Sequence, residues 1–105
     1  MRVPAEVVEA FRAGLRLYDA GYGGAGLRPQ TVREARAVVR TREVSEEKAR
    51  RMLAWFARHD TPVERRARCR QLAALDAGRS IAKAPALTAW LLWGGTTARK
   101  WLSRR

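Results

Sequence analysis

Signals that begin a helix recur at short intervals along this chain, and they limit its fold more than any other feature. Thr31 and Thr61 are each followed three residues later by a glutamate, Glu34 and Glu64. In this capping-box pattern the Thr hydroxyl accepts a hydrogen bond from an unpaired N–H of the first turn, and the glutamate reaches back. Ser45 precedes two glutamates, and acidic residues favour the positive end of a helix dipole. We therefore expect helices to begin just after Thr31, Ser45 and Thr61.

Apolar residues recur at helical spacing between these starts, and no segment alternates between apolar and polar residues as a half-buried strand would. Glycines, above all those of residues 21–26, end the helical segments. The predicted helices cover residues 4–19, 32–40, 46–58, 62–77 and 86–93, and Thr96 caps a last one. The predicted fold class is therefore all-α, a compact bundle of about five to six short helices.

Three of these helices carry an apolar stripe. Residues spaced three and four apart lie on one face of a helix, so each stripe predicts which side chains are buried. The stripes are Val7, Phe11, Leu15 and Tyr18; Ala49, Met52, Leu53 and Phe56; and Ala98, Trp101 and Leu102. Trp55 lies at the edge of the second stripe.

The length of 105 residues corresponds to one small domain with a single modest core. Its composition divides it into four parts. They are a neutral N-terminal helix with a glycine-rich loop (1–27), a helix pair (28–60), an arginine-rich segment (61–85) and tryptophan-rich C-terminal helices (86–105).

The single cysteine, Cys69, excludes an internal disulfide and fits a reducing compartment. The first residues do not form a signal-peptide pattern. The longest apolar stretch, residues 84–93, is too short to cross a bilayer. We expect a soluble, cytoplasmic protein without a membrane partner.

The charge of the chain is +12 and is unevenly distributed. Residues 1–27 are neutral, residues 28–60 carry nine basic and five acidic side chains, and residues 61–105 carry ten basic side chains against two acids. Such a charge opposes compaction, so a polyanionic partner is expected. Nucleic acid is the first candidate, because clustered arginines that bind its phosphates release condensed counterions, and this release favours binding.

The same arginine content has a second reading. Only three of the 22 basic residues are Lys, and a GC-rich genome also raises the number of arginines. The basic surface is then a solvated one, or one that meets an acidic protein. The concentration of charge in the second half of the chain favours the nucleic-acid reading.

The candidate nucleic-acid contacts fall into three groups. The main group lies in the fourth predicted helix, the second in a pair of helices (32–40 and 46–58) whose outline resembles a helix-turn-helix, and the third near the C-terminus. They are Arg65, Arg66, Arg68 and Arg70; Lys48, Arg50 and Arg51; and Arg99 and Lys100. Ordinary packing of the two helices is the alternative to a groove-reading pair.

Four tryptophans, a lone histidine and a lone thiol are the other side chains that carry chemistry. Trp55, Trp90, Trp93 and Trp101 are able to stack on bases, but their apolar surroundings favour core positions, with Trp93 the most exposed. His59 is expected to cap a helix end. With Cys69 it supplies too few ligands for a metal and lacks the orienting third group of a nucleophilic site, so no enzyme, metal or cofactor is expected.

Two stretches of the chain resemble a known family. Residues 45–52 (Ser-Glu-Glu-Lys-Ala-Arg-Arg-Met) run into residues 55–59 (Trp-Phe-Ala-Arg-His), and residues 89–95 read Ala-Trp-Leu-Leu-Trp-Gly-Gly. They resemble a small helical domain encoded by tailed bacteriophages and prophages, alone or attached to head-region proteins. The resemblance covers most of residues 3–60 and 86–102.

Residues 61–85 depart from that family, which is similar elsewhere but has a polar stretch rich in Gly and Asp in place of residues 65–70. The resemblance implies a viral or prophage context, in the host cytoplasm or the virion, and no particular activity. It also implies that Met52, Phe56, Trp90 and Trp93 are shared core residues.

We therefore expect a small basic protein of phage type that binds nucleic acid without catalysis, mainly through phosphates, with double-stranded DNA as the expected form. The alternative is a phage head or host-interaction protein whose basic surface docks on an acidic protein of the phage or host. No small-molecule substrate is expected.

Overall fold

The structure, a computed structural model, describes all 105 residues as an all-α fold. It has six helices and no strand; only an isolated bridge joins Arg2 to Glu43. The helices are α1 (Ala5–Asp19), α2 (Pro29–Thr41), α3 (Glu46–His59), α4 (Pro62–Asp76), α5 (Pro85–Leu92) and α6 (Gly95–Ser103). None of them is both long and apolar enough for a membrane span.

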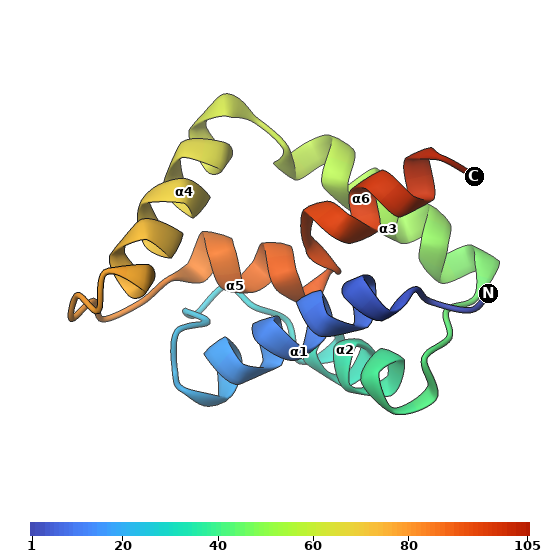
Figure 1. The fold of residues 1–105 in the computed structure, drawn as a ribbon, viewed down its shortest axis with the longest axis horizontal. Helices are drawn as coiled ribbons and strands as arrows, with labels where there is room; N and C mark the ends of the chain where they lie inside the picture. Colours follow the sequence, from blue (N-terminus) through green and yellow to red (C-terminus); the bar gives the residue numbers. More distant parts are fainter.

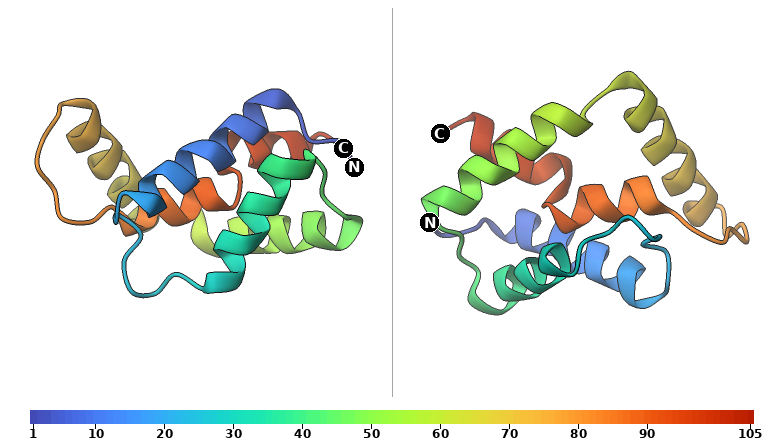
Figure 2. Two further views of the ribbon diagram at one scale, coloured as in Figure 1. Left: turned by 90° about the horizontal axis from the view of Figure 1, so that it is seen from below. Right: turned by 180° about the vertical axis from the view of Figure 1, so that it is seen from behind.

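Helix α1 lies at the centre of the fold and packs on α2, α5 and α6. Helix α3 runs beside α6, as the view from behind shows (Figure 2). Helix α4 stands at one end of the molecule, opposite both chain termini, and packs mainly on α5 (Figure 1). Only Ala74 of α4 is buried, so most of this helix is surface.

The core lies where α1, α3 and α5 meet, and its largest fully buried side chains include Phe11, Met52, Phe56 and Leu92. Gly14 sits where α1 crosses α5. A Cβ there would lie 2.7 Å from the backbone N of Leu92, so only glycine permits this approach.

Two of the four expected side-chain caps are present. The Ser45 hydroxyl accepts a hydrogen bond from the Lys48 N–H at 3.0 Å, and the Thr61 hydroxyl accepts one from the Glu64 N–H at 3.2 Å. Both caps were predicted from the residue pattern alone. These two starts place α3 and α4 close to their predicted bounds.

The expected caps at Thr31 and Thr96 were wrong. Helix α2 begins at Pro29, whose missing N–H suits a first helical position, so Thr31 lies inside the helix and is buried. Helix α6 begins at Gly95, and the Thr96 hydroxyl instead accepts a hydrogen bond from the indole N–H of Trp90 at 3.1 Å.

Two of the predicted core residues are on the surface. Tyr18 and Leu53 are each 38% exposed. Tyr18 lies in the last turn of α1, beside the glycine-rich loop, and Leu53 shares the solvent face of α3 with Arg50. Trp101 is only half-buried against the core. The remaining stripe residues are buried as predicted.

Candidate functional site

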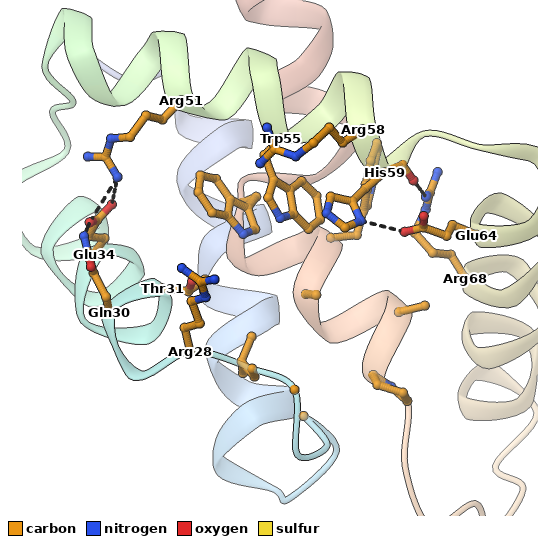
Figure 3. Close-up of a pocket in the computed structure, with 18 residues that line it drawn as sticks. Arg28, Gln30, Thr31, Glu34, Arg51, Trp55, Arg58, His59, Glu64 and Arg68 are labelled. Carbon is orange, nitrogen blue, oxygen red and sulfur yellow. Dashed lines mark hydrogen bonds and ion pairs between the residues drawn. The ribbon is translucent and has the colours of Figure 1, made fainter.

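An open groove with a volume of about 780 Å³ runs between α3 and the start of α2, with α5 as its base and the start of α4 at one end. Figure 3 looks into it. Helix α3 supplies a stripe of four residues, Arg51, Trp55, Arg58 and His59, whose spacing puts them on one side of the helix. The adjacent side of α3 is held in the core by Met52 and Phe56.

An aromatic stack forms the wall of this groove. The Trp55 ring stacks on His59, with centroids 4.3 Å apart, and on Trp93, with centroids 5.2 Å apart and planes at 12°. The ammonium group of Lys48 lies 4.2 Å from the centroid of the Trp93 ring. These two neighbours cover part of the ring surface of Trp55 on which a base could otherwise stack.

The indole N–H groups differ in whether they are satisfied. The N–H of Trp90 donates to Thr96, whereas those of Trp55 and Trp93, which also line the groove, donate to no group of the chain. A half-buried indole N–H is a donor without acceptor capacity. The stack therefore offers two free donors to whatever enters the groove.

Both carboxylates that line the groove are already paired. Glu34 accepts hydrogen bonds from Lys48 at 2.6 Å, Gln30 at 2.7 Å and Arg51 at 3.1 Å. Partial burial opposes its ionisation, but the bonds from Lys48 and Gln30 and the charges of Lys48 and Arg51 outweigh burial and lower the pKa of Glu34 to about 2. At the other end, Glu64 lies 2.9 Å from Nδ1 of His59.

Two arginines of the groove have no partner. Arg28 extends from the residue that precedes α2, and Arg58 from the last turn of α3, on opposite sides of the aromatic stack (Figure 3). Neither forms an ion pair or a hydrogen bond, and both are exposed. With its acids occupied, the groove presents two free guanidinium groups and two free indole N–H groups. This arrangement attracts an anion that accepts hydrogen bonds.

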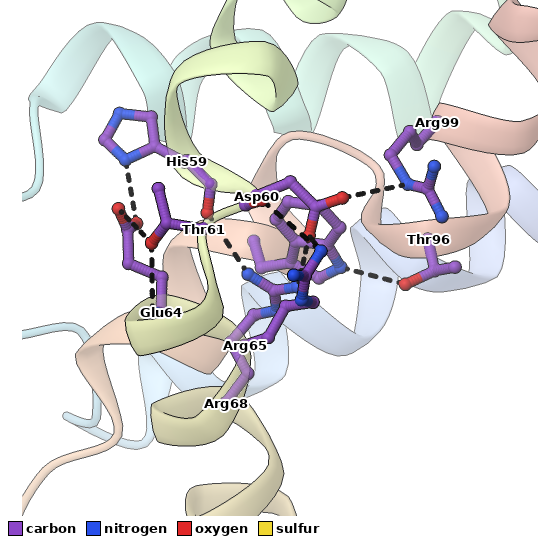
Figure 4. A network of polar contacts seen from close by, with 9 residues as sticks. His59, Asp60, Thr61, Glu64, Arg65, Arg68, Thr96 and Arg99 are labelled. Carbon is purple, nitrogen blue, oxygen red and sulfur yellow. Dashed lines mark hydrogen bonds and ion pairs between the residues drawn. The ribbon is translucent and has the colours of Figure 1, made fainter.

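A second polar network lies beyond the end of the groove, around Asp60 (Figure 4). The carboxylate of Asp60 accepts hydrogen bonds from Arg65 at 3.4 Å and from Arg68 at 3.2 Å, and the Nε atom of Arg99 lies 3.8 Å from it. The guanidinium of Arg68 also stacks on Trp90 at 3.6 Å. Its side chain is only 12% exposed, so Arg68 is mainly a packing residue.

The predicted main group of arginines is thus split by the fold. Arg65 and Arg68 turn toward Asp60, whereas Arg66 and Arg70 are exposed and unpaired. Arg50 and Lys100 are also exposed and unpaired, while Arg99 is partly engaged by Asp60.

The second predicted group needs a correction at Lys48. This side chain is 8% exposed, and burial lowers its pKa more than the hydrogen bond and charge of Glu34 raise it. It is therefore not available to a phosphate in this structure. Arg51, shared between Glu34 and Glu47, lines the groove but is already paired. Helix α2 packs mainly on α1, and helix α3 packs mainly on α6. The ion pairs of Glu34 with Lys48 and Arg51 therefore join α2 to α3 more than direct packing of the two helices does.

Sequence reasoning missed Arg28, Arg58 and the stack as parts of a single site. The spacing of residues 51, 55, 58 and 59 is a signal for one half of it. The other half comes from Arg28 and Trp93, which only the tertiary fold brings near α3.

His59 and Cys69 do not share a site. His59 lines the groove, pairs with Glu64 and stacks on Trp55, while the exposed Cys69 lines a different hollow. The structure contains no group of three or more His, Cys, Asp or Glu side chains placed to hold a metal ion.

Comparisons of this chain with models of protein families, with curated proteins and with solved structures find no match.

Proposed function

We propose that this protein binds nucleic acid without catalysing a reaction, through phosphate contacts centred on the groove beside Trp55. One observation carries the proposal: both acids that line the groove are paired within the chain, and its free groups are the donors of Arg28, Arg58, Trp55 and Trp93. Phosphate oxygens are anionic acceptors, and guanidinium groups bind them in pairs of hydrogen bonds.

The size of the groove favours a single strand over a duplex. A volume of about 780 Å³ receives a short piece of one strand, whose phosphates reach Arg28 and Arg58 on either side of the stack. A duplex presents a broad convex surface and has to stay outside such a groove. This refines the expectation from the sequence, in which double-stranded DNA was the partner.

Exposed arginines outside the groove add attraction without specificity. Arg66, Arg70, Arg50 and Lys100 have no acidic partner, and the whole chain carries +12. Such charges raise the local concentration of a polyanion and speed its association, and salt screens them. In this proposal they support binding and the groove defines the contact.

The test is a titration followed by tryptophan fluorescence, since Trp55 and Trp93 line the groove. A single-stranded oligonucleotide of about 12 nucleotides and a matched duplex are compared at about 50 and about 200 mM salt. We expect the single strand to quench the fluorescence and to bind more tightly. The double variant R28Q/R58Q should lower the log–log salt slope by about 1.4, as for two lost phosphate contacts on a single strand.

The matched control is R16Q/R40Q, which removes two exposed, unpaired arginines that do not line the groove. It should lower affinity at low salt but keep most of the slope. Equal log–log salt slopes for the two double variants would mean that the phosphate contacts lie outside the groove. Absence of any binding at about 50 mM salt would end the nucleic-acid proposal.

A further inference from the structure

A second hollow of about 530 Å³ separates α4 from α5 and α6. Its walls are largely apolar: Leu72 and Cys69 come from α4, Leu87 and Leu91 from α5, and Ala10 from α1. Figure 1 shows α4 standing away from α6 at this place. Leu72 is 48% exposed although it faces this cleft, so its apolar surface is not fully covered within the chain.

One end of the cleft is strongly cationic. Arg65, Arg68 and Arg99 surround the single carboxylate of Asp60, which leaves two positive charges without a counter-charge (Figure 4). In addition, the Nε atom of Arg99 is buried and has no hydrogen-bond partner, because the nearest Asp60 oxygen is 3.8 Å away. An incoming carboxylate meets the accessible guanidinium nitrogens at this end, because the side chain of Arg65 is 51% exposed and that of Arg99 is 37% exposed.

We propose that this cleft docks a segment of an acidic partner protein, in which a large apolar side chain is closely followed by Asp or Glu. The apolar side chain fills the space between Leu72, Leu87 and Leu91, and the carboxylate reaches the arginines around Asp60. An apolar groove between helices is a common docking place for an amphipathic segment. Charge complementarity sets the register of that segment.

The charge of the chain argues against a second copy of itself as the occupant. Each copy carries +12, so a cationic cleft repels it. The cationic end also attracts a phosphate, but the remaining walls are mainly apolar and suit the side chain of a peptide better than the sugar-phosphate backbone of a nucleic acid. The cleft is a separate site from the groove, although Trp90 and Arg68 form the wall between them.

The experiment is an affinity selection from a library of random peptides of about ten residues, with the full chain immobilised. We expect selected peptides to share an apolar residue next to an acidic one, and to bind L72S about tenfold more weakly. The control is V63S, which changes an apolar residue of the same helix that is 67% exposed and outside the cleft. It should bind the peptides as the unchanged protein does.

The cationic end is tested with a second matched pair of variants. R65Q removes an arginine that lines the cleft, and R66Q removes its exposed neighbour that does not. We expect R65Q to bind the selected peptides about fivefold more weakly, as for the loss of one partly exposed ion pair. R66Q should bind them as the unchanged protein does.

Cys69 reports occupation of the cleft directly in the unchanged protein. A selected peptide should slow its alkylation by iodoacetamide, and an oligonucleotide should not. Three results would each overturn the proposal. They are selected peptides that lack the apolar–acidic pair, an equal loss of peptide affinity in L72S and V63S, and protection of Cys69 from alkylation by the oligonucleotide. Nucleic-acid binding by L72S should be normal, so failure here is distinct from failure of the groove.

Discussion

The ammonium group of Lys48 lies 2.6 Å from Oε1 of Glu34, and this ion pair joins α3 to α2. The pKa values of both partners are lowered, for different reasons. Glu34 has three donors, which outweigh its partial burial, whereas Lys48 is more deeply buried and has one carboxylate beside it. Lys48 is therefore the partner that depends more on the pair.

Removing Glu34 should accordingly cost more than removing Lys48. In E34Q the buried ammonium loses its only counter-charge, and we expect unfolding free energy to fall by about 3 kcal/mol. In K48M the carboxylate keeps Arg51 and Gln30, so a loss of about 1 kcal/mol is expected. Urea unfolding measures both. The double variant should recover most of the loss of E34Q, and a simple sum of the two losses would contradict this account.

The ionisation of Glu34 should make the stability of the protein depend on pH in the acid range. Its pKa is about 2 in the folded chain against an ordinary 4.5, so the folded state favours the charged form. The resulting stability is complete above about pH 4.5 and is lost as the pH falls toward about 2. After allowance for solvent screening we expect a loss of about 1 to 2 kcal/mol. E34Q should lack this part of the acid transition; an unchanged profile in E34Q would assign it to other acids.

Arg68 and Arg66 should respond differently to substitution although they are close in sequence. R68Q loses the Asp60 contact and the stack on Trp90, so unfolding free energy should fall by about 2 kcal/mol. R66Q removes an exposed, unpaired side chain and should change stability by less than about 0.5 kcal/mol. Thermal unfolding by circular dichroism compares the two. Equal losses would mean that Arg68 is not held as the structure shows.

Gly14 should not tolerate even one additional methyl group. In G14A the new Cβ would lie 2.7 Å from Leu92 N and 2.8 Å from the carbonyl carbon of Leu91, so α1 and α5 have to separate. The helix propensity of Ala recovers about 1 kcal/mol, and we expect a net loss of about 1 to 3 kcal/mol. G26A is the control, because its Cβ meets nothing within 4 Å, and it should unfold like the unchanged protein.

Local signals predicted where helices begin only when no stronger signal lay nearby. The Ser45 and Thr61 hydroxyls cap α3 and α4 because each lies at the first possible start after a break. At Thr31 the same pattern failed, since Pro29 begins the helix two residues earlier and releases Glu34 to pair with Lys48. Gly94 and Gly95 similarly displace Thr96 from the expected cap.

The sequence by itself determined the class of the fold, because capping residues, glycines and helical spacing act within a few neighbouring residues. It also determined the excess of arginine. Only the tertiary structure decided which arginines are free, since pairing depends on where Asp60, Glu34 and Trp90 lie in space. Only the tertiary structure decided the groove and the cleft as well, because each is lined by helices that are distant along the chain and meet only after packing.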